Sequence, residues 1–121
     1  MKILLRILAL IYAIAAIMHI GSILGFGRMP FGDMAVAWQL SDIAYGIIDT
    51  IAAIGLWQQK NWGIAAFLLA AGSEIVLFVF VPEWFTSDPA ELTMLRGFVV
   101  YHLIAITTFG VLRYSSRKTL P

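Results

Sequence analysis

Cysteine is absent from this chain of 121 residues, and charged residues are scarce. Without cysteine the protein has no disulfide bond, no thiolate metal ligand and no cysteine nucleophile. Aspartate, glutamate, lysine and arginine together make up 12% of the sequence, whereas a typical soluble domain carries roughly a quarter. This shortage of charge indicates that lipid, and not water, covers much of the protein surface.

A strongly basic surface is missing as well. Eight Lys and Arg residues against seven Asp and Glu residues leave a formal net charge of +1. No stripe of basic residues could follow a phosphate backbone, so the sequence argues against binding of nucleic acid. Hydrophobic residues make up 61% of the chain, and its mean hydropathy is +0.91. The expected surroundings are therefore a lipid bilayer.

Four long apolar runs occupy nearly the whole chain, at about residues 3–24, 34–57, 62–81 and 89–113. Each is close to the roughly 20 residues that a helix needs to cross a hydrocarbon core. Backbone groups in lipid must be hydrogen-bonded within their own segment, so the runs are predicted to be helices. The predicted fold is an all-α, four-helix transmembrane bundle, with residues 1–121 forming a single membrane domain.

The segments between the runs have the composition of turns and helix caps. Gly25–Asp33 contains glycine and proline, and Asp33 is predicted to cap the second helix. Asp88 is predicted to cap the fourth helix, because Pro89 follows it at the first helical position. Small residues four apart should let helices approach closely; these pairs are Gly21 with Gly25, Ala9 with Ala13, and Ala66 with Ala70.

Basic residues are distributed unevenly between the two ends of the predicted bundle. One end carries Lys2, Arg6, Lys60, Arg113, Arg117 and Lys118. The other end carries Arg28 together with the acidic residues Glu83, Asp88 and Glu91. By the positive-inside rule the basic end faces the cytoplasm. Both termini are therefore predicted to be cytoplasmic.

The second helix carries an unusual polar stripe. Asp42, Tyr45 and Asp49 are spaced three and four residues apart, so they lie on one helix face, which Gln39 extends outward. A charged side chain inside hydrocarbon costs at least a few kcal/mol, so this face should point into the bundle. A proton path from Asp42 through Tyr45 to Asp49 is one conceivable use of the stripe.

The other three helices also bring polar side chains towards the bundle interior. With a rise of 1.5 Å per residue, His19, Asp42 and Glu74 are expected roughly 4–9 Å outward of the membrane midplane, and His102 near it. Arg96 is expected about 10 Å outward, where it could pair with Glu74 or Asp42. Asp49 is expected deeper in the membrane than Asp42, at the level of Thr107. The further candidates for a polar network or proton path are therefore Gln39, Asp49, Arg96 and Thr107.

Three interpretations of this convergence remain open. The polar residues could simply hold the helices together through hydrogen bonds and ion pairs. They could ligate a metal, but no His pair at i and i+4 and no Glu-x-x-His motif is present, so no metal is predicted. They could also bind an amphipathic molecule such as a quinone or lipid. The candidate ligand-binding residues are then His19, Asp42, Tyr45, Glu74 and His102.

Several short motifs give the sequence a family resemblance. These motifs are Met29-Pro30-Phe31-Gly32, Trp38-Gln39, Asp42-Ile43, Ala52-Ala53, Gly55-Leu56-Trp57, Trp62-Gly63 and Ser73-Glu74-Ile75. With these the chain resembles an uncharacterised family of small four-helix inner-membrane proteins from alphaproteobacteria. In architecture alone it is similar to the DoxX-like group, whose name derives from a quinone-linked oxidoreductase subunit. The resemblance implies a multi-pass protein of the bacterial inner membrane.

The sequence favours an accessory or structural subunit of a larger membrane complex, and a respiratory complex is one candidate. Small size, the absence of a soluble domain and small-residue helix faces support this interpretation, and other subunits or a second copy are the expected partners. The alternative is a quinone- or lipid-binding protein that uses the buried His and carboxylate residues. A small membrane isomerase or transporter is a further alternative. No resident cofactor is predicted, although a quinone would suit the site, and a non-catalytic role is favoured over an enzyme.

Overall fold

The computed structural model describes residues 1–118, with side chains described through residue 116. Its elements are α1 (Lys2–Ile23), the short 3-10 helix η1 (Phe31–Asp33), α2 (Val36–Trp57), α3 (Asn61–Phe80), a second 3-10 helix η2 (Pro82–Trp84) and α4 (Pro89–Lys118). No strand occurs in this part of the chain, so the all-α prediction is confirmed. The helix α4 continues past the predicted end at residue 113. The side chains of Arg117 and Lys118 lie outside the described residues.

All four α-helices are long and apolar enough to cross a membrane. Many large apolar side chains point away from the bundle, for example Ile3, Ile17 and Phe80, each more than two-thirds exposed. Such side chains would be unfavourable in water but suit a lipid environment. The helices therefore indicate a membrane protein, as the composition predicts.

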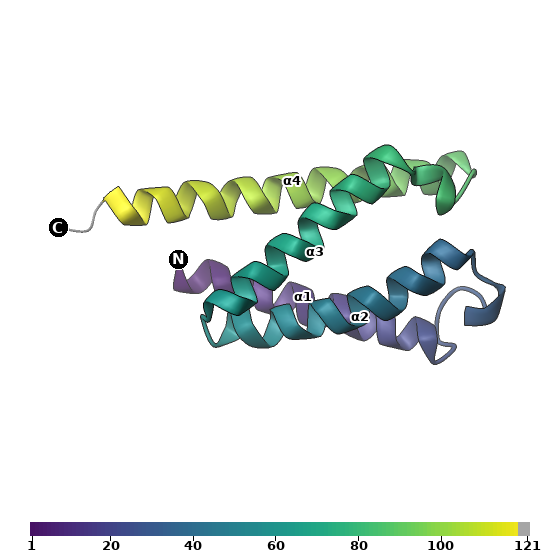
Figure 1. The fold of residues 1–121 in the computed structure, drawn as a ribbon, viewed down its shortest axis with the longest axis horizontal. Coiled ribbons are helices and arrows are strands. Elements are labelled where there is room, and N and C mark those ends of the chain that lie inside the picture. Colours follow the sequence, from purple (N-terminus) through teal and green to yellow (C-terminus); the bar gives the residue numbers. More distant parts are fainter. Residues whose placement is uncertain (119–121) are drawn as a thin grey trace.

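The four helices run alternately in opposite directions (Figure 1). The N-terminus, the turn between α2 and α3, and the C-terminal end of α4 lie at one end of the molecule. The principal packed pairs are α1 with α2, α2 with α3 and α3 with α4, while α3 runs diagonally between the α1–α2 pair and α4. Since α1 and α4 are not among these pairs, the first and last helices pack against each other much less than successive helices do in the described part of the chain.

Two apolar clusters flank the middle of the bundle. The larger cluster contains Leu56, Phe67 and Phe109, and the Phe67 and Phe109 rings meet edge to face with centroids 5.7 Å apart. The smaller cluster contains Phe78, Phe85 and Leu95, and the Trp38 indole N–H donates a hydrogen bond of 2.9 Å to the Phe85 carbonyl. Along α2, α3 and α4 the polar residues lie between these two clusters, which shield them from both ends.

Two sequence predictions about helix ends are wrong. The pair of Gly21 and Gly25 does not form a helix-packing face, because α1 ends at Ile23 and Gly25 adopts a positive φ of 93°. The Phe26 N–H bonds to the Gly21 carbonyl at 2.9 Å, which is the hydrogen bond of a Schellman C-cap. Asp33 belongs to η1, and extended backbone at Met34 delays α2, so Asp33 does not cap it.

The other predictions for helix ends and small residues agree with the structure. Asp88 precedes α4, and its Oδ1 accepts a hydrogen bond of 3.3 Å from the Ala90 N–H, as an N-cap should. Ala9 and Ala70 are buried within the larger core cluster. Their small side chains thus serve packing within the chain itself.

Two helices approach each other very closely where α2 turns into α3. A Cβ atom added to Gly55 would lie 2.4 Å from the Cα of Gly63, and one added to Gly63 would lie 2.2 Å from the Gly55 carbonyl carbon. The nearest neighbours are backbone atoms, with the Trp62 ring also 2.7 Å from a Cβ added to Gly55, so a movable side chain alone cannot make room. Both residues must be glycine for the two helices to meet here.

The substitution Gly63→Ala should therefore lower the free energy of unfolding by about 1–3 kcal/mol or more, because overpacking strains the backbone. Equilibrium unfolding in mixed micelles measures this loss. Gly72→Ala is the matched control on the same helix, since its added Cβ meets nothing within 4 Å; it should be neutral or stabilise by up to about 1 kcal/mol. Equal stability of the two variants would contradict the proposed close approach.

Candidate functional site

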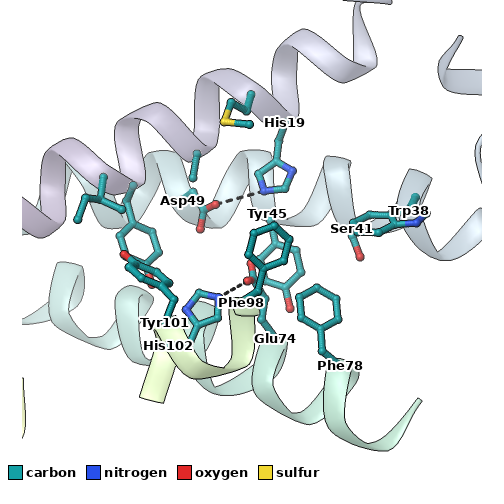
Figure 2. A pocket seen from close by; sticks show the side chains of 14 residues that line it. His19, Trp38, Ser41, Tyr45, Asp49, Glu74, Phe78, Phe98, Tyr101 and His102 are labelled. Atoms are coloured by element: carbon teal, nitrogen blue, oxygen red, sulfur yellow. Dashed lines mark hydrogen bonds and ion pairs between the residues drawn. The ribbon is translucent and has the colours of Figure 1, made fainter. Parts of the chain in front are cut away.

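A cavity of about 450 Å³ lies among the four α-helices, and Figure 2 shows the side chains around it. Its wall is largely apolar and aromatic, with Ile11 and Met18 from α1, Phe78 from α3 and Phe98 from α4. Met18 is 69% exposed and Phe98 is 40% exposed, so the cavity reaches the outer surface between α1 and α4. In a membrane this opening faces the hydrocarbon.

The first polar contact of the site joins α1 to α2. Asp42 is buried, and its Oδ1 lies 2.8 Å from His19 Nδ1. The other carboxylate oxygen accepts a hydrogen bond of 2.7 Å from the Ser22 hydroxyl. Because the carboxylate is an acceptor, the proton of this contact belongs to His19 Nδ1. Two residues singled out from the sequence, His19 and Asp42, are thus direct partners.

Asp49 shares a partner with Asp42, although it lies two turns further along α2, and this partner is not the one that the sequence predicted. Its side chain is 2% exposed, and Oδ2 is 3.5 Å from His19 Nε2. The imidazole of His19 therefore lies between Asp42 and Asp49, which are two turns apart on one face of α2. Thr107, the expected partner of Asp49, is exposed on α4. Thr107 lies five positions after buried His102 on α4, so the two side chains point to different sides of that helix.

A second His and carboxylate pair joins α3 to α4. His102 Nε2 and Glu74 Oε2 are in direct contact, and the imidazole is buried. Figure 2 shows both side chains turned towards the group formed by His19 and Asp49. All four helices thus supply an ionisable side chain to one region, as the sequence predicted.

Tyr45 makes a different contact from the one expected. Its hydroxyl lies 2.7 Å from Ser73 Oγ, and the Ser73 hydroxyl donates to the Ala70 carbonyl at 3.1 Å. The Tyr45 hydroxyl must therefore donate to Ser73. Tyr45 makes no hydrogen bond to Asp42 or Asp49 within the described residues. The two aspartates are instead connected through His19, so the proton path that the sequence suggested does not run through Tyr45.

Two further candidates lie away from the cavity. Arg96 is exposed on α4, and every ion pair found among the described residues joins a histidine to a carboxylate, so its expected pairing with Glu74 or Asp42 is wrong. Gln39 holds the loop before α2 through hydrogen bonds to its backbone. Its Nε2 donates to the carbonyls of Phe31, Gly32 and Met34 at 3.0–3.2 Å.

Four buried polar atoms have no hydrogen-bond partner among the described residues. They are the hydroxyls of Tyr12 and Tyr101, Oδ1 of Asp49 and Nδ1 of His102. All four residues line the cavity. A buried polar atom without a partner costs about 1–3 kcal/mol. The wall of this one cavity therefore holds four unsatisfied hydrogen-bonding groups among the described residues.

Tyr12 was not singled out from the sequence. It lies seven residues before His19 and therefore on the same face of α1, and this spacing was the available signal. Tyr101 adjoins His102, and the two rings meet with centroids 5.1 Å apart. The structure thus adds two hydroxyl groups to the set predicted from the sequence.

A second hollow of about 420 Å³ lies on the outer side of α1 and α2. Isoleucines, Gly46 and Thr50 line it, and it contains no ionisable side chain. The Thr50 hydroxyl already donates to the Gly46 carbonyl within α2 at 2.6 Å. This hollow therefore offers shape but little specific chemistry.

Comparison with known proteins places the chain in a family. Residues 1–117 match the model described as "Family of unknown function (DUF6163)", and the protein belongs to that family. No curated protein and no solved structure gives a significant match. The family membership agrees with the expected uncharacterised family, and it assigns no activity to the cavity.

The link between α1 and α2 can be tested by removing its acceptor. Asp42→Ala should destabilise the protein by about 1–3 kcal/mol, because it leaves His19 Nδ1 and the Ser22 hydroxyl without their partner. Ser22→Ala removes one bond and should cost less, about 0.6–1.7 kcal/mol. Equilibrium unfolding in mixed micelles gives both values. Asp33→Ala, at an exposed position in η1, is the control, and an equal effect there would refute the structural role of Asp42.

Proposed function

We propose that the protein binds a lipid-soluble molecule with a hydrogen-bonding head group in the cavity between its four helices, and that the molecule is a quinone. The observation that carries this proposal is the location of the four unpartnered polar atoms in the wall of one largely apolar cavity. A volume of about 450 Å³ is within the range of roughly 300–1,000 Å³ found for small-molecule sites.

The chemistry of the wall suits both redox forms of a quinone. The hydroxyls of Tyr12 and Tyr101 can donate to carbonyl oxygens of the oxidised form. His102 donates its Nε2 proton to the Glu74 carboxylate, so its neutral imidazole offers Nδ1 as an acceptor. That acceptor can take a hydrogen bond from a hydroxyl of the reduced form. Phe78 and Phe98 supply apolar and aromatic surface for the ring.

The opening between α1 and α4 supports a ligand that arrives through the membrane. The exposed side chains at this opening, Met18 and Phe98, are apolar. A molecule dissolved in the hydrocarbon could enter there without passing through water, whereas a sugar would find no polar route through this opening. A lipid-soluble ligand thus fits the access route as well as the site.

The proposed setting is a bacterial inner membrane, with both ends of the chain on the cytoplasmic side. Lys2, Arg6, Lys60 and Arg113 belong to the end of the bundle that holds the N-terminus and the α2–α3 turn. The Arg6 guanidinium lies 4.7 Å from the centroid of the Trp57 ring at that end. Basic and aromatic residues together are typical of the cytoplasmic membrane interface.

The role of an accessory subunit in a larger membrane complex stays a prediction from the sequence, and so do partner subunits or a homo-oligomer. The isomerase and transporter alternatives also stay predictions. Binding of a quinone is compatible with a subunit role, because respiratory subunits meet quinones in the same membrane. The cavity, in contrast to size or composition, gives a specific chemistry that can be measured.

Filling the cavity tests the proposal. Ala15→Phe places a ring in the cavity wall, whereas Ala65→Phe adds the same ring at an exposed position of α3 and serves as the control. A short-chain ubiquinone analogue added to the purified protein in mild detergent should quench the fluorescence of Trp38, which lines the cavity. We expect Ala15→Phe to raise the Kd about tenfold or more, a change of about 1.4 kcal/mol.

The control variant should bind the analogue like the unmodified protein. Native mass spectrometry of protein released from its own membranes provides a second measurement, since a retained quinone would appear as extra mass. Absence of saturable binding, or equal binding by Ala15→Phe and Ala65→Phe, would refute the proposal.

A further inference from the structure

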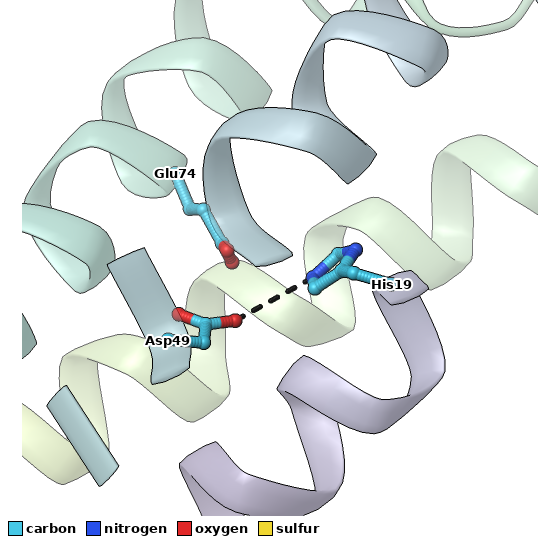
Figure 3. A group of neighbouring side chains, drawn as sticks. All are labelled: His19, Asp49 and Glu74. Carbon is cyan, nitrogen blue, oxygen red and sulfur yellow. Dashed lines mark ion pairs between the residues drawn. The ribbon is translucent and has the colours of Figure 1, made fainter. Parts of the chain in front are cut away.

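We propose that His19, Asp49 and Glu74 bind one divalent transition-metal ion (Figure 3). The three residues belong to α1, α2 and α3, and each offers one ligand atom within 4.8 Å of the other two. This inference goes beyond the proposed quinone site and does not rest on it, although both share the same cavity. Figure 3 shows the two carboxylates and the imidazole turned towards one another.

His19 is held as metal-binding histidines usually are. Its Nδ1 donates to Oδ1 of Asp42 at 2.8 Å, and the Ser22 hydroxyl fixes the other oxygen of that carboxylate at 2.7 Å. A carboxylate behind the imidazole fixes the ring orientation and strengthens the opposite nitrogen as a ligand. That opposite nitrogen, Nε2, points at Asp49.

The contact between His19 and Asp49 is too long for an ordinary hydrogen bond. Nε2 and Oδ2 are 3.5 Å apart, whereas N–H···O bonds are usually about 2.7–3.2 Å long. With the proton of a neutral imidazole on Nδ1, a nitrogen lone pair faces a carboxylate oxygen. Two ligand atoms that each lie about 2.0–2.2 Å from a zinc ion are separated by a similar distance. A cation beside both atoms would turn this repulsion into attraction.

Asp49 supplies an independent observation. Its side chain is 2% exposed, and Oδ1 has no partner among the described residues. A carboxylate this deeply buried needs a partner of opposite charge or a donor. A metal ion beside Asp49 would meet that need, and the nearby imidazole alone leaves Oδ1 without any contact.

The charges of the region point the same way. Three carboxylates, from Asp42, Asp49 and Glu74, meet two imidazoles, from His19 and His102. No lysine or arginine lines the cavity. Negative charge is therefore in excess even if both imidazoles are protonated, and excess charge within hydrocarbon is costly. One divalent cation would offset two of these negative charges.

The donor set narrows the choice of metal. One imidazole and two carboxylates suit Zn²⁺, Fe²⁺ or Mn²⁺, while no thiolate ligand is available for softer ions. His102 contacts Glu74 and so positions that carboxylate, as Asp42 positions His19. The sequence predicted no metal because the donors are not paired along any one helix; three helices bring them together.

Binding of Co²⁺ as a spectroscopic probe tests this inference. The full-length protein is purified in mild detergent, treated with a chelator, desalted and titrated with CoCl₂. We expect visible d–d absorption that saturates at one ion per chain and is displaced by Zn²⁺. Asp49→Asn and His19→Gln should abolish saturation. Asp42→Asn should weaken binding about 10–100-fold, as is typical when a residue behind a ligand is changed. Ser73→Ala, which removes the hydrogen bonds of Ser73 to Tyr45 and to the Ala70 carbonyl but no ligand atom, is the control and should bind normally.

X-ray absorption at the cobalt edge on the unmodified protein should show imidazole and oxygen ligands, and this result is independent of whether any variant folds. Absence of saturable Co²⁺ and Zn²⁺ binding by the folded protein would overturn the inference and would make His19 a protonated bridge between two carboxylates. Unchanged binding by Asp49→Asn and His19→Gln would also overturn it. Quinone binding measured on the same preparation separates this outcome from failure of the proposed function.

Discussion

The constraint on which the structure depends is the cost of carboxylates within an apolar bundle. Asp42 and Glu74 each lie against an imidazole from another helix, and Asp49 lies beside the second ring nitrogen of His19. His19 joins α1 to α2, and His102 joins α4 to α3. The same contacts that provide partners for the carboxylates therefore also fix which helices face one another. Structure and chemistry depend here on the same few side chains, so a purely structural role and a binding role are not exclusive.

The open packing of the bundle creates the cavity. The glycine contact between α2 and α3 and the long pairing of α1 with α2 bring three helices close together. The last helix packs mainly on α3, which leaves a space bordered by α1 and α4. Because aromatic side chains surround this space and polar atoms without partners lie in its wall, it has the properties of a binding site. The proposed quinone and metal would use different parts of it, the apolar wall and the carboxylate group respectively.

The candidate residues differ in how well their positions followed from the sequence. The stripe of Asp42, Tyr45 and Asp49 was correct because helical periodicity alone places residues on a face. Asp49 was assigned the wrong partner, since depth along one helix does not tell how the neighbouring helices are rotated. The predictions for Arg96 and Thr107 were wrong for the same reason. Both residues are on α4, but their side chains point to other sides of the helix than that of His102. Tyr12 was overlooked because its one signal, the spacing of seven residues from His19, is seen only when the two residues are considered together.

Sequence analysis correctly predicted four apolar helices, their approximate bounds and the meeting of a polar side chain from each helix in one region. These properties follow from local composition and periodicity, which need no knowledge of neighbours. The tertiary structure was needed to show that His19 lies between two aspartates and that ligand atoms of Glu74 and Asp49 lie close to each other. It was also needed to show that a cavity opens between α1 and α4. Those relations depend on the rotation and tilt of each helix against the next. Side-chain packing across the whole bundle sets these angles, and no segment of the sequence specifies them alone.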